Sequence, residues 1–599
     1  MTQKKECDIY KVRHTIFIMK KSIKPRNSRY IGFLVSTSLC LFSGQVKASE
    51  RVSQGFYAFK KPTQEVAQLT QRTQTLVFNG NNLTPSDVIK VARNGAKVSI
   101  SDAALKRLQT AHELLLLAAK NGQAIYGLTQ GVGLNKDQTL VDAKGNLSQE
   151  VIRRSQEFNR GLIYAHSAGA GHEMSKDVVR AIMAVRLNSI LFGSTGVQPK
   201  VAQLYSDFLN NDIVPIIPSR GSVGQADITL ITHIGLAMIG EGEVYYQDKK
   251  MPASQALKMA GLETLVPFGK DSLSILSSNA YSAALGALAV AELENALKIS
   301  KLVFALSLEA FDGNIEPFLE DANKIRPFPE ANQVSRDIRE ILSGSYLWEK
   351  SEERALQDPL SYRTGAYILG AGEHSLKQLQ EQLKIQLNSS DDNPAVVLDV
   401  GPPSTRSEEA SLYVNEGGIR GAVMPTANFS PLPWVISFQE AAIALSYLSN
   451  ASAQRTIKLG DPHFTHLSRF LGTENTVHAY GAIQKTFVAL AVENQELAAP
   501  ILDNFAIAGN IEDVSTNAPR TVQRVRTQID TLYYILGIEM MHAAQAIDLR
   551  LQKNPNLKLS IVTKSFFEQY RQVVPFMKSD RVLTYDIEKS YSFLKEYPK

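Results

Sequence analysis

Four long stretches, in which small and apolar residues recur with the period of a helix, constrain the fold of this chain most. They are residues 101–120, 281–310, 435–458 and 476–499. The first runs from Ser101, a capping residue, toward Gly122, and the second, rich in Ala and Leu, ends near Gly313. Long helices joined by short Gly, Pro and Asn segments favour an all-α bundle, with minor strand content near residues 243–246.

Composition sets the scale of this bundle. The chain has 599 residues, of which 44% are hydrophobic, which is enough for a large core with more than one subregion. The expected regions are a leader (1–48), a loop-rich N-terminal region (49–280), a central bundle of long helices (281–525) and a C-terminal helical region (526–599).

The first of these regions differs from the rest in composition. Basic residues between Lys20 and Arg29 precede the apolar run 31–42, and Ala48 ends the segment. This order is typical of a secretory signal peptide, and the apolar run is shorter than a membrane-spanning helix requires. An N-terminal anchor is the alternative. We therefore expect a periplasmic or secreted protein.

The leader also accounts for the charge and the cysteines. The full chain has a net charge of +5, but residues 1–48 hold 10 Lys and Arg against 2 Asp and Glu, which leaves −3 for the remainder. The basic balance therefore does not indicate a nucleic-acid partner. Cys7 and Cys40 both lie in the leader, so the rest forms no disulfide and no thiolate metal site. After cleavage we expect no membrane attachment.

Seven short motifs follow one another along the chain. They are YGLTQGVG (126–133), HSAG (166–169), GSVGQAD (221–227), QDPLSYR (357–363), DNP (392–394), NF (428–429) and NIED (510–513). In this order they resemble the motifs of the aromatic amino-acid ammonia-lyases, the family of histidine and phenylalanine ammonia-lyase. The resemblance covers nearly all of residues 75–599. It implies a mostly helical homotetramer whose active sites combine loops from three subunits.

The GSVGQAD segment departs from that family. The matching Gly-Ser-Val-Gly-Ala-Ser-Gly-Asp contains a tripeptide, Ala-Ser-Gly, that cyclises with loss of water into a methylidene-imidazolone, the electrophile that captures the substrate amine. Here Gln225 and Ala226 stand in place of three residues, with no Ser hydroxyl to eliminate and no Gly nitrogen to close the ring. Leu360 replaces a family Tyr, and LSSNA (276–280) replaces Leu-Asn-Gly-Thr-Gln. We therefore expect replaced chemistry and no cofactor.

Three residues match positions that the family uses directly. Tyr126 lies in a Gly-flanked turn and matches the base that removes the substrate's β-proton; a core tyrosine with a satisfied hydroxyl is the alternative. Arg363 matches the arginine that holds the substrate carboxylate through two parallel hydrogen bonds; a surface salt bridge is the alternative. Asn428 resembles a second carboxylate contact, or else has a structural role in a turn.

Lys485 lies on a helix face that the sequence predicts to be buried. Its neighbours three and four residues away are Gly481, Ala482, Val488 and Ala489. A buried ammonium is costly unless it is paired, and Glu512 in the NIED motif is the expected partner. Alternatively, Lys485 extends to solvent or lies at an interface.

A quaternary ammonium makes the missing electrophile unnecessary. An α-ammonium readily loses a proton and becomes a poor leaving group, whereas a trimethylammonium leaves as a neutral amine. We therefore expect an aromatic betaine as the substrate, and the pattern is similar to family members that eliminate trimethylamine from ergothioneine to give thiourocanate. Arg363 would hold the carboxylate and Tyr126 would take the proton. Lys485, set by Glu512, would stabilise charge on the thioimidazole.

Other parts of this hypothesis are less constrained. Phe429 and Asp392 are candidates for contact with the trimethylammonium group. The alternatives are elimination from another aromatic betaine such as hercynine, a non-catalytic betaine-binding protein, and an ordinary ammonia-lyase, against which the missing Ser argues. No metal is expected, because His463 and His466 are only three residues apart and have no obvious third ligand.

Overall fold

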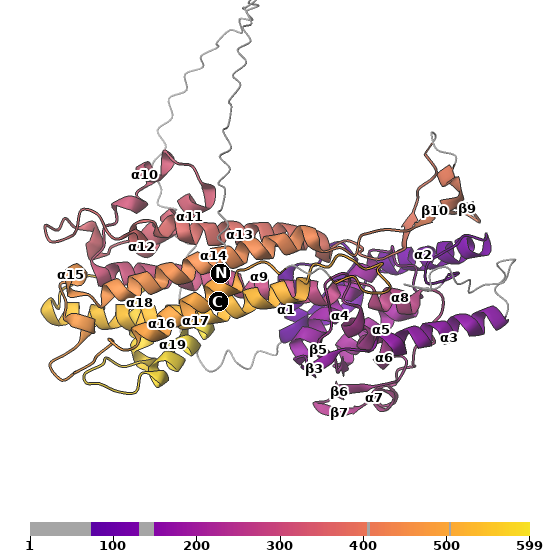
Figure 1. Cartoon of the computed structure of the whole chain (residues 1–599), viewed down its shortest axis with the longest axis horizontal. Helices are drawn as coiled ribbons and strands as arrows, with labels where there is room; N and C mark the ends of the chain where they lie inside the picture. Colours follow the sequence, from indigo (N-terminus) through magenta and orange to yellow (C-terminus); the bar gives the residue numbers. More distant parts are fainter. Residues whose placement is uncertain (1–73, 131–148, 404–407, 502–504, 599) are drawn as a thin grey trace, which may run out of the picture. The chain divides into compact units, whose positions relative to one another are not determined.

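The computed structural model describes residues 74–130, 149–403, 408–501 and 505–598, and their fold is mainly helical (Figure 1). The α-helices are α1 (Pro85–Arg93), α2 (Asp102–Lys120), α3 (Gln149–His166), α4 (Lys176–Leu191), α5 (Pro199–Asn211), α6 (Ile228–Met238), α7 (Ala253–Met259), α8 (Asp271–Leu276), α9 (Ala280–Phe311), α10 (Glu320–Lys324), α11 (Pro329–Ile341), α12 (Leu360–Arg363), α13 (Gly365–Leu387), α14 (Leu432–Leu459), α15 (Pro462–Thr465), α16 (Gln484–Leu497), α17 (Ala518–Lys553), α18 (Ile561–Val573) and α19 (Thr584–Glu596). The predicted all-α class is confirmed. The predicted leader lies outside the described residues.

Short strands accompany the helices in four small sheets. The strands are β1 (Thr75–Phe78), β2 (Lys97–Ile100), β3 (Ala170–Glu173), β4 (Val214–Pro215), β5 (Pro218–Arg220), β6 (Glu243–Tyr246), β7 (Lys249–Pro252), β8 (Ala395–Leu398), β9 (Tyr413–Glu416) and β10 (Ile419–Met424). β1 and β2 pair in parallel, whereas the orders β8-β10-β9, β3-β5 and β4-β6-β7 are antiparallel. The predicted strand near residues 243–246 is β6, and the other strands were not predicted from the sequence.

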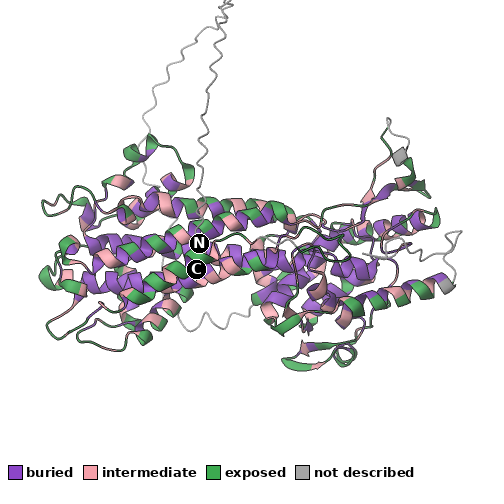
Figure 2. Ribbon diagram, viewed as in Figure 1, coloured by how far each residue is buried: buried purple, intermediate pink, exposed green. Residues whose placement is uncertain are grey.

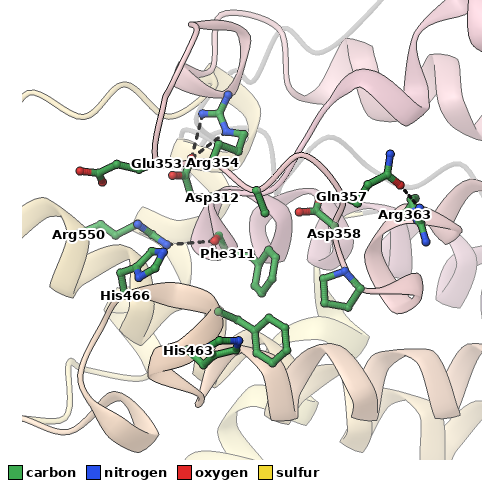
Figure 3. A pocket seen from close by; sticks show the side chains of 13 residues that line it. Phe311, Asp312, Glu353, Arg354, Gln357, Asp358, Arg363, His463, His466 and Arg550 are labelled. Atoms are coloured by element: carbon green, nitrogen blue, oxygen red, sulfur yellow. Dashed lines mark hydrogen bonds and ion pairs between the residues drawn. The ribbon is translucent and has the colours of Figure 1, made fainter.

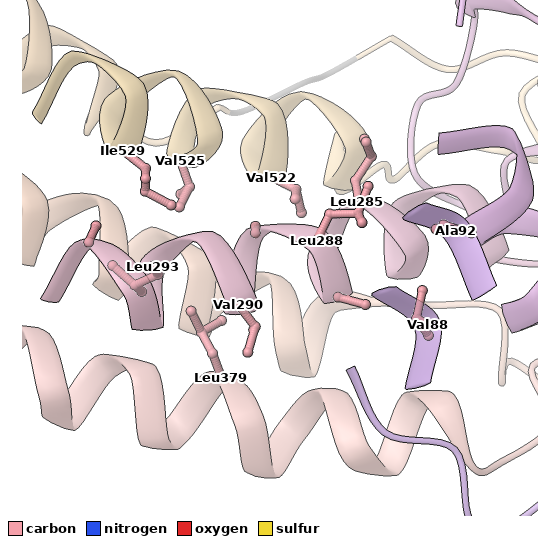
Figure 4. Close-up of a cluster of buried hydrophobic side chains, with 14 of the residues drawn as sticks. Val88, Ala92, Leu285, Leu288, Val290, Leu293, Leu379, Val522, Val525 and Ile529 are labelled. Carbon is pink, nitrogen blue, oxygen red and sulfur yellow. The ribbon is translucent and has the colours of Figure 1, made fainter. Parts of the chain in front are cut away.

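Helix α9 forms the centre of the core. Its Ala- and Leu-rich sequence is apolar around most of its circumference, so it packs on α17, α14, α13 and α4 rather than on one neighbour. The helix ends where Asp312 adopts a left-handed conformation at φ +62°. Figure 4 shows side chains of α1, α9, α13 and α17 that meet in this core, among them Val88, Leu285, Leu288, Leu379, Val522 and Ile529.

Helix α9 can be so apolar because it is buried inside the protein. Among the described residues, Asp271–Phe311 is the one segment long and apolar enough to cross a membrane, and 94% of the tested window is buried inside the protein. The core helix of a globular bundle meets the same criteria of length and composition. Figure 2 shows the buried residues gathered along the inner faces of the long helices.

The predicted long helices are found, with one difference. Residues 101–120 correspond to α2, where the Ser101 side chain accepts from the Ala104 N–H, and residues 281–310 and 435–458 lie within α9 and α14. In the fourth segment, the helix begins only at Gln484. The preceding turns are fixed by Asp580, whose carboxylate accepts three consecutive backbone N–H groups at 2.7, 3.0 and 2.8 Å. This distant contact replaces helical hydrogen bonds. All the described residues belong to one compact unit, and the region boundaries at 280 and 525 stay predictions.

His542 makes the stability of this core depend on pH. It is 1% exposed, its ring centroid lies 4.6 Å from that of Tyr480, and burial lowers its pKa from 6.5 to about 4. The unfolded chain therefore binds a proton below pH 6.5 that the folded chain resists, and His542 alone lowers the free energy of unfolding by about 3 kcal/mol between pH 6.5 and 4.

We expect the variant His542→Leu to remove this component, as measured by urea unfolding at pH 7.5, 5.5 and 4.5. His478→Gln, at an exposed histidine, is the matched control and should keep the wild-type slope. Asp227 and Asp358, whose pKa values are raised to about 6, contribute the opposite slope in all three proteins. Equal pH slopes for His542→Leu and the wild type would contradict the prediction.

Candidate active site

The loop 221–227 joins β5 to α6 and is held from both sides. The Asn517 N–H and the Thr516 hydroxyl donate to its backbone carbonyls at 2.8 and 2.6 Å, and the last N–H of the loop donates to Ser278 O at 2.7 Å. Gly224 allows the close approach: it lies at φ +77°, and a Cβ there would be 2.4 Å from the first backbone nitrogen of α17. Gln225 and Ala226 therefore lie in a well-anchored loop.

Asp227 ends this loop as a buried carboxyl group. Its oxygens accept from the Ser222 hydroxyl at 2.6 Å and from the Ser282 N–H at 2.8 Å, in the first turn of α9. Burial raises its pKa to about 6, and these hydrogen bonds oppose the rise. The carboxyl thus links the loop to the N-terminal end of α9.

Asn279 connects the loop to a second segment of the predicted site. Its Oδ1 accepts from the Ala226 N–H at 3.1 Å, and its Nδ2 donates to Phe429 O at 2.6 Å. Its own N–H donates to Asp391 at 2.7 Å. The sequence offered only a weak signal for this role, an Asn just before a long apolar helix, which suggests a cap. The side chain makes no cap and joins two loops instead.

Tyr126 lies beside the same region. It is half-buried and packs against Leu162, Leu273 and Leu276, the last two in α8, immediately before Asn279. The following Gly127 has φ +77°, and a Cβ there would lie 2.3 Å from the Leu273 side chain. The Gly-flanked turn that the sequence indicated is therefore required for the tyrosine to reach α8. Its role as a base stays a prediction.

Asn428, Phe429 and Glu512 lie in loops. Phe429 is half-buried and is tied through its backbone, whereas the Asn428 side chain is exposed. Glu512 is also exposed, and its backbone pairs with Ile507 in the segment that leads to α17. Their contacts with a substrate stay predictions.

Asp392 does not face a substrate pocket, and that prediction is wrong. It is fully buried, with its carboxylate paired to Lys270 and, at 3.3 Å, to Arg186. Arg186 also contacts Asp391 at 3.2 Å, so two cations and two carboxylates balance one another in the core. The sequence could not reveal this role, because the partners lie more than 120 residues away. Asp391 accepts from the Asn279 N–H, so this ionic cluster also helps to hold the two loops that Asn279 joins.

Arg363 is the last residue of the short helix α12, at the opposite end of α9. Tyr362 fixes this helix: it is fully buried, stacks on Phe311 with ring centroids 4.3 Å apart, and shares a hydrogen bond of 3.0 Å with Ser307. Arg363 itself is half-buried and donates to Gln357. The guanidinium thus stands on a rigid support.

A cavity of about 540 Å³ adjoins Arg363, as Figure 3 shows. Its lining includes Asp312, Arg354 and Asp358, together with rings from α15. Asp358 is 4% exposed, and its carboxyl group accepts from the Asn314 N–H at 2.7 Å. Burial raises its pKa to about 6, while Arg354 and Arg363 oppose the rise. The cavity therefore combines cationic groups with carboxyls, one of which changes charge near pH 6.

The prediction that Lys485 is buried is wrong for the single chain. Its side chain is exposed in the first turn of α16, because no other part of the described chain covers this face. No ion pair joins it to Glu512 among the described residues. The neighbouring Phe487 packs on His542 of α17, with ring centroids 6.0 Å apart. Glu512 precedes α17, whose first residue lies 24 positions before His542. Because that interval of helix spans about 36 Å, Lys485 and Glu512 lie far apart in one chain.

The predicted residues are therefore divided along the bundle. Tyr126 and Phe429 lie at the N-terminal end of α9, beside Asn279, which was not predicted, and Arg363 lies beside its C-terminal end. A helix of 32 residues is about 48 Å long. One chain cannot bring these groups to one small substrate. Among the described residues, no three His, Cys, Asp or Glu side chains are grouped to hold a metal ion.

Sequence similarity to known enzymes places this protein among the lyases. Residues 83–572 match the aromatic amino acid lyase family, and the chain belongs to that family. Membership of this family identifies it as a carbon–nitrogen lyase. Histidine ammonia-lyase of Treponema denticola is 31% identical over 529 residues, covering 87% of this chain and 97% of that protein.

Solved structures agree with this assignment. The crystal structure of ergothionase, an ergothioneine-degrading enzyme from Treponema denticola, has a TM-score of 0.78 and 38% identity, covering 87% of this chain and 99% of that one. Histidine ammonia-lyase from Trypanosoma cruzi has a TM-score of 0.74 at 24% identity, covering 87% of this chain and 93% of that one, and shares the fold.

Proposed function

We propose that this protein eliminates trimethylamine from ergothioneine to give thiourocanate. The observation that carries the proposal is the loop at Gln225 and Ala226, which supplies neither the Ser hydroxyl nor the Gly nitrogen that the family's electrophile requires. The loop is closed by hydrogen bonds, including the Ala226 N–H to Asn279. The similarity to an ergothioneine-degrading enzyme supports the choice of substrate.

The reaction is a 1,2-elimination. Arg363 holds the betaine carboxylate, and the Tyr126 oxygen, as the phenolate, takes the proton from the carbon beside the ring. The electrons of that C–H bond form the C=C bond, and the C–N bond breaks, so that trimethylamine leaves with its electron pair. Lys485, set by Glu512 of another subunit, stabilises the charge that spreads into the thioimidazole.

This mechanism requires several copies of the chain. The bundle exposes an apolar stripe along α14 and α16. It comprises Leu432, Ile436, Ile443 and Tyr447 on α14 and Val488 and Val492 on α16, exposed by 42–66%. Exposed apolar faces of this kind favour association. In the proposed homotetramer, this face and Lys485 become buried, and Arg363 of one subunit meets Tyr126 of another.

A direct assay tests the function. Purified protein is supplied with ergothioneine, thiourocanate is followed by its ultraviolet absorbance, and released trimethylamine is measured in the same sample. We expect both products in equal amounts. A folded tetramer that yields neither product would exclude the proposal. The proposed site of action is the periplasm or the extracellular medium.

Lys485 distinguishes ergothioneine from other aromatic betaines. We expect Lys485→Met to lower kcat with ergothioneine by about 10²-fold, because the charge on the thioimidazole loses its cationic partner. The loss with hercynine, which has no sulfur, should be smaller. Lys564→Met, at a lysine that is 62% exposed on α18, is the matched control. An equal loss with both substrates would show that Lys485 does not act on the thiourea group.

A further inference from the structure

Gln225 carries an amide without a hydrogen bond in the loop that replaces the family's tripeptide. Its Oε1 is buried and has no hydrogen-bond partner among the described residues, although the residue as a whole is half-exposed. Leaving a buried carbonyl oxygen unpaired costs about 1–3 kcal/mol. The amide can also rotate without breaking a hydrogen bond. An unpaired acceptor on so firmly held a loop needs an explanation.

The backbone around Gln225 is fixed, so its side chain starts from a defined position. Gly224 on one side is held by Thr516, and Ala226 on the other lies at φ +60° with its N–H bonded to Asn279. Few rotatable bonds therefore separate the amide from a rigid frame. Such a support suits a residue that contacts a ligand.

An aromatic residue lies close to the same loop. The Asn279 side chain alone spans from the Ala226 N–H to Phe429 O, so the backbone of Phe429 lies one short side chain from the residue that follows Gln225. A carbonyl oxygen and an aromatic ring share one property: each attracts a cation that donates no conventional hydrogen bond. A quaternary ammonium is such a cation.

We propose that the Gln225 carbonyl oxygen, with Phe429, forms the binding site for the trimethylammonium group of the substrate. This inference rests on the proposed function and names the group that occupies the place of the missing tripeptide. The carbonyl dipole lies against the polarised methyl groups, and the ring covers another side. When trimethylamine leaves as a neutral molecule, this attraction is lost, which favours release of the product.

Two small carboxylates test this site without turnover. Glycine betaine carries the carboxylate and the trimethylammonium but has no β-carbon, so it cannot be eliminated. Its neutral isostere, 3,3-dimethylbutanoate, has carbon in place of the ammonium nitrogen. Binding of both to the full, assembled protein is measured by ligand-observed NMR. We expect glycine betaine to bind roughly three- to tenfold more tightly than the isostere.

The variants give opposite expected shifts. Gln225→Leu should lower this preference to near unity, and Gln225→Glu should raise it above the wild-type value, because a carboxylate attracts the cation more strongly. Gln109→Leu, at an exposed glutamine on α2, should keep the wild-type preference. Melting temperature and assembly mass of each variant establish that it has folded. A purely structural glutamine would not give a gain with glutamate.

Several results would overturn the inference. One is that glycine betaine does not bind to the wild type. Another is that Gln225→Leu keeps the wild-type preference for glycine betaine over 3,3-dimethylbutanoate, whether KM for ergothioneine stays the same or rises. A raised KM with an unchanged preference would mean that the Gln225 amide accepts a hydrogen bond from the substrate ring. If glycine betaine binds through Gln225 but ergothioneine yields no trimethylamine, the inference stands and the proposed reaction fails.

Discussion

Replacing Tyr126 with Phe is expected to lower kcat for trimethylamine release by about 10²- to 10⁴-fold, with little change in KM. The phenol oxygen is the proposed base, and the substitution removes that oxygen alone. The ring keeps its packing against Leu162, Leu273 and Leu276. Protein stability should therefore change little, so the loss of rate reports on proton abstraction.

Steady-state formation of thiourocanate measures this effect. Tyr164→Phe is the matched control, because Tyr164 is a tyrosine on α3 that is 50% exposed and donates to Glu241 at 3.4 Å. This control should retain wild-type activity. If Tyr126→Phe keeps more than a tenth of the wild-type kcat, another group abstracts the proton.

Replacing Arg363 with Met should lower kcat/KM by roughly 10²- to 10³-fold, because the substrate carboxylate loses its charged partner. Arg363→Lys should restore little, since an ammonium cannot form two parallel hydrogen bonds. The helix itself should stay in place, because the buried Tyr362 ring on Phe311 fixes α12.

The position of Arg363 allows a sharper experiment with two inactive variants. Tyr126 and Arg363 lie at opposite ends of α9, so a complete site must take them from different chains. We expect co-expression of Tyr126→Phe and Arg363→Met chains to restore activity, because about a quarter of the sites in randomly mixed tetramers receive both wild-type residues. Mixed tetramers can be isolated with two affinity tags. Isolated mixed tetramers that are no more active than their parents would show that the site is not shared.

The sequence predicted the long helices well, because helical period is a local property. Residues 281–310 are apolar on nearly every side, and α9 is buried on nearly every side. Residues 476–483 looked helical by the same criterion, but Asp580, about 100 positions later, captures their N–H groups. A short stretch of sequence does not contain both partners of that contact.

In the candidate site, too, only the features that depend on local sequence could be predicted. Tyr126 lies in the turn that its flanking glycines require, and Phe429 is tied to the loop near Gln225. Asp392 was misassigned because a buried ion pair with Lys270 depends on tertiary contacts. Lys485 was expected to be buried, but its side chain is exposed in the single chain. A sequence records which helix face is apolar, but not whether the rest of the chain covers it.

The hydrogen bond from Ala226 to Asn279 has a consequence for how the enzyme becomes active. A ring made from the backbone must be formed by a chemical reaction after the chain has folded, so such an enzyme passes through an immature state. A loop closed by hydrogen bonds alone is complete as soon as folding and assembly end. In the proposed enzyme, newly made protein would therefore gain activity without a maturation lag, and refolded protein would recover it as fast as its subunits associate.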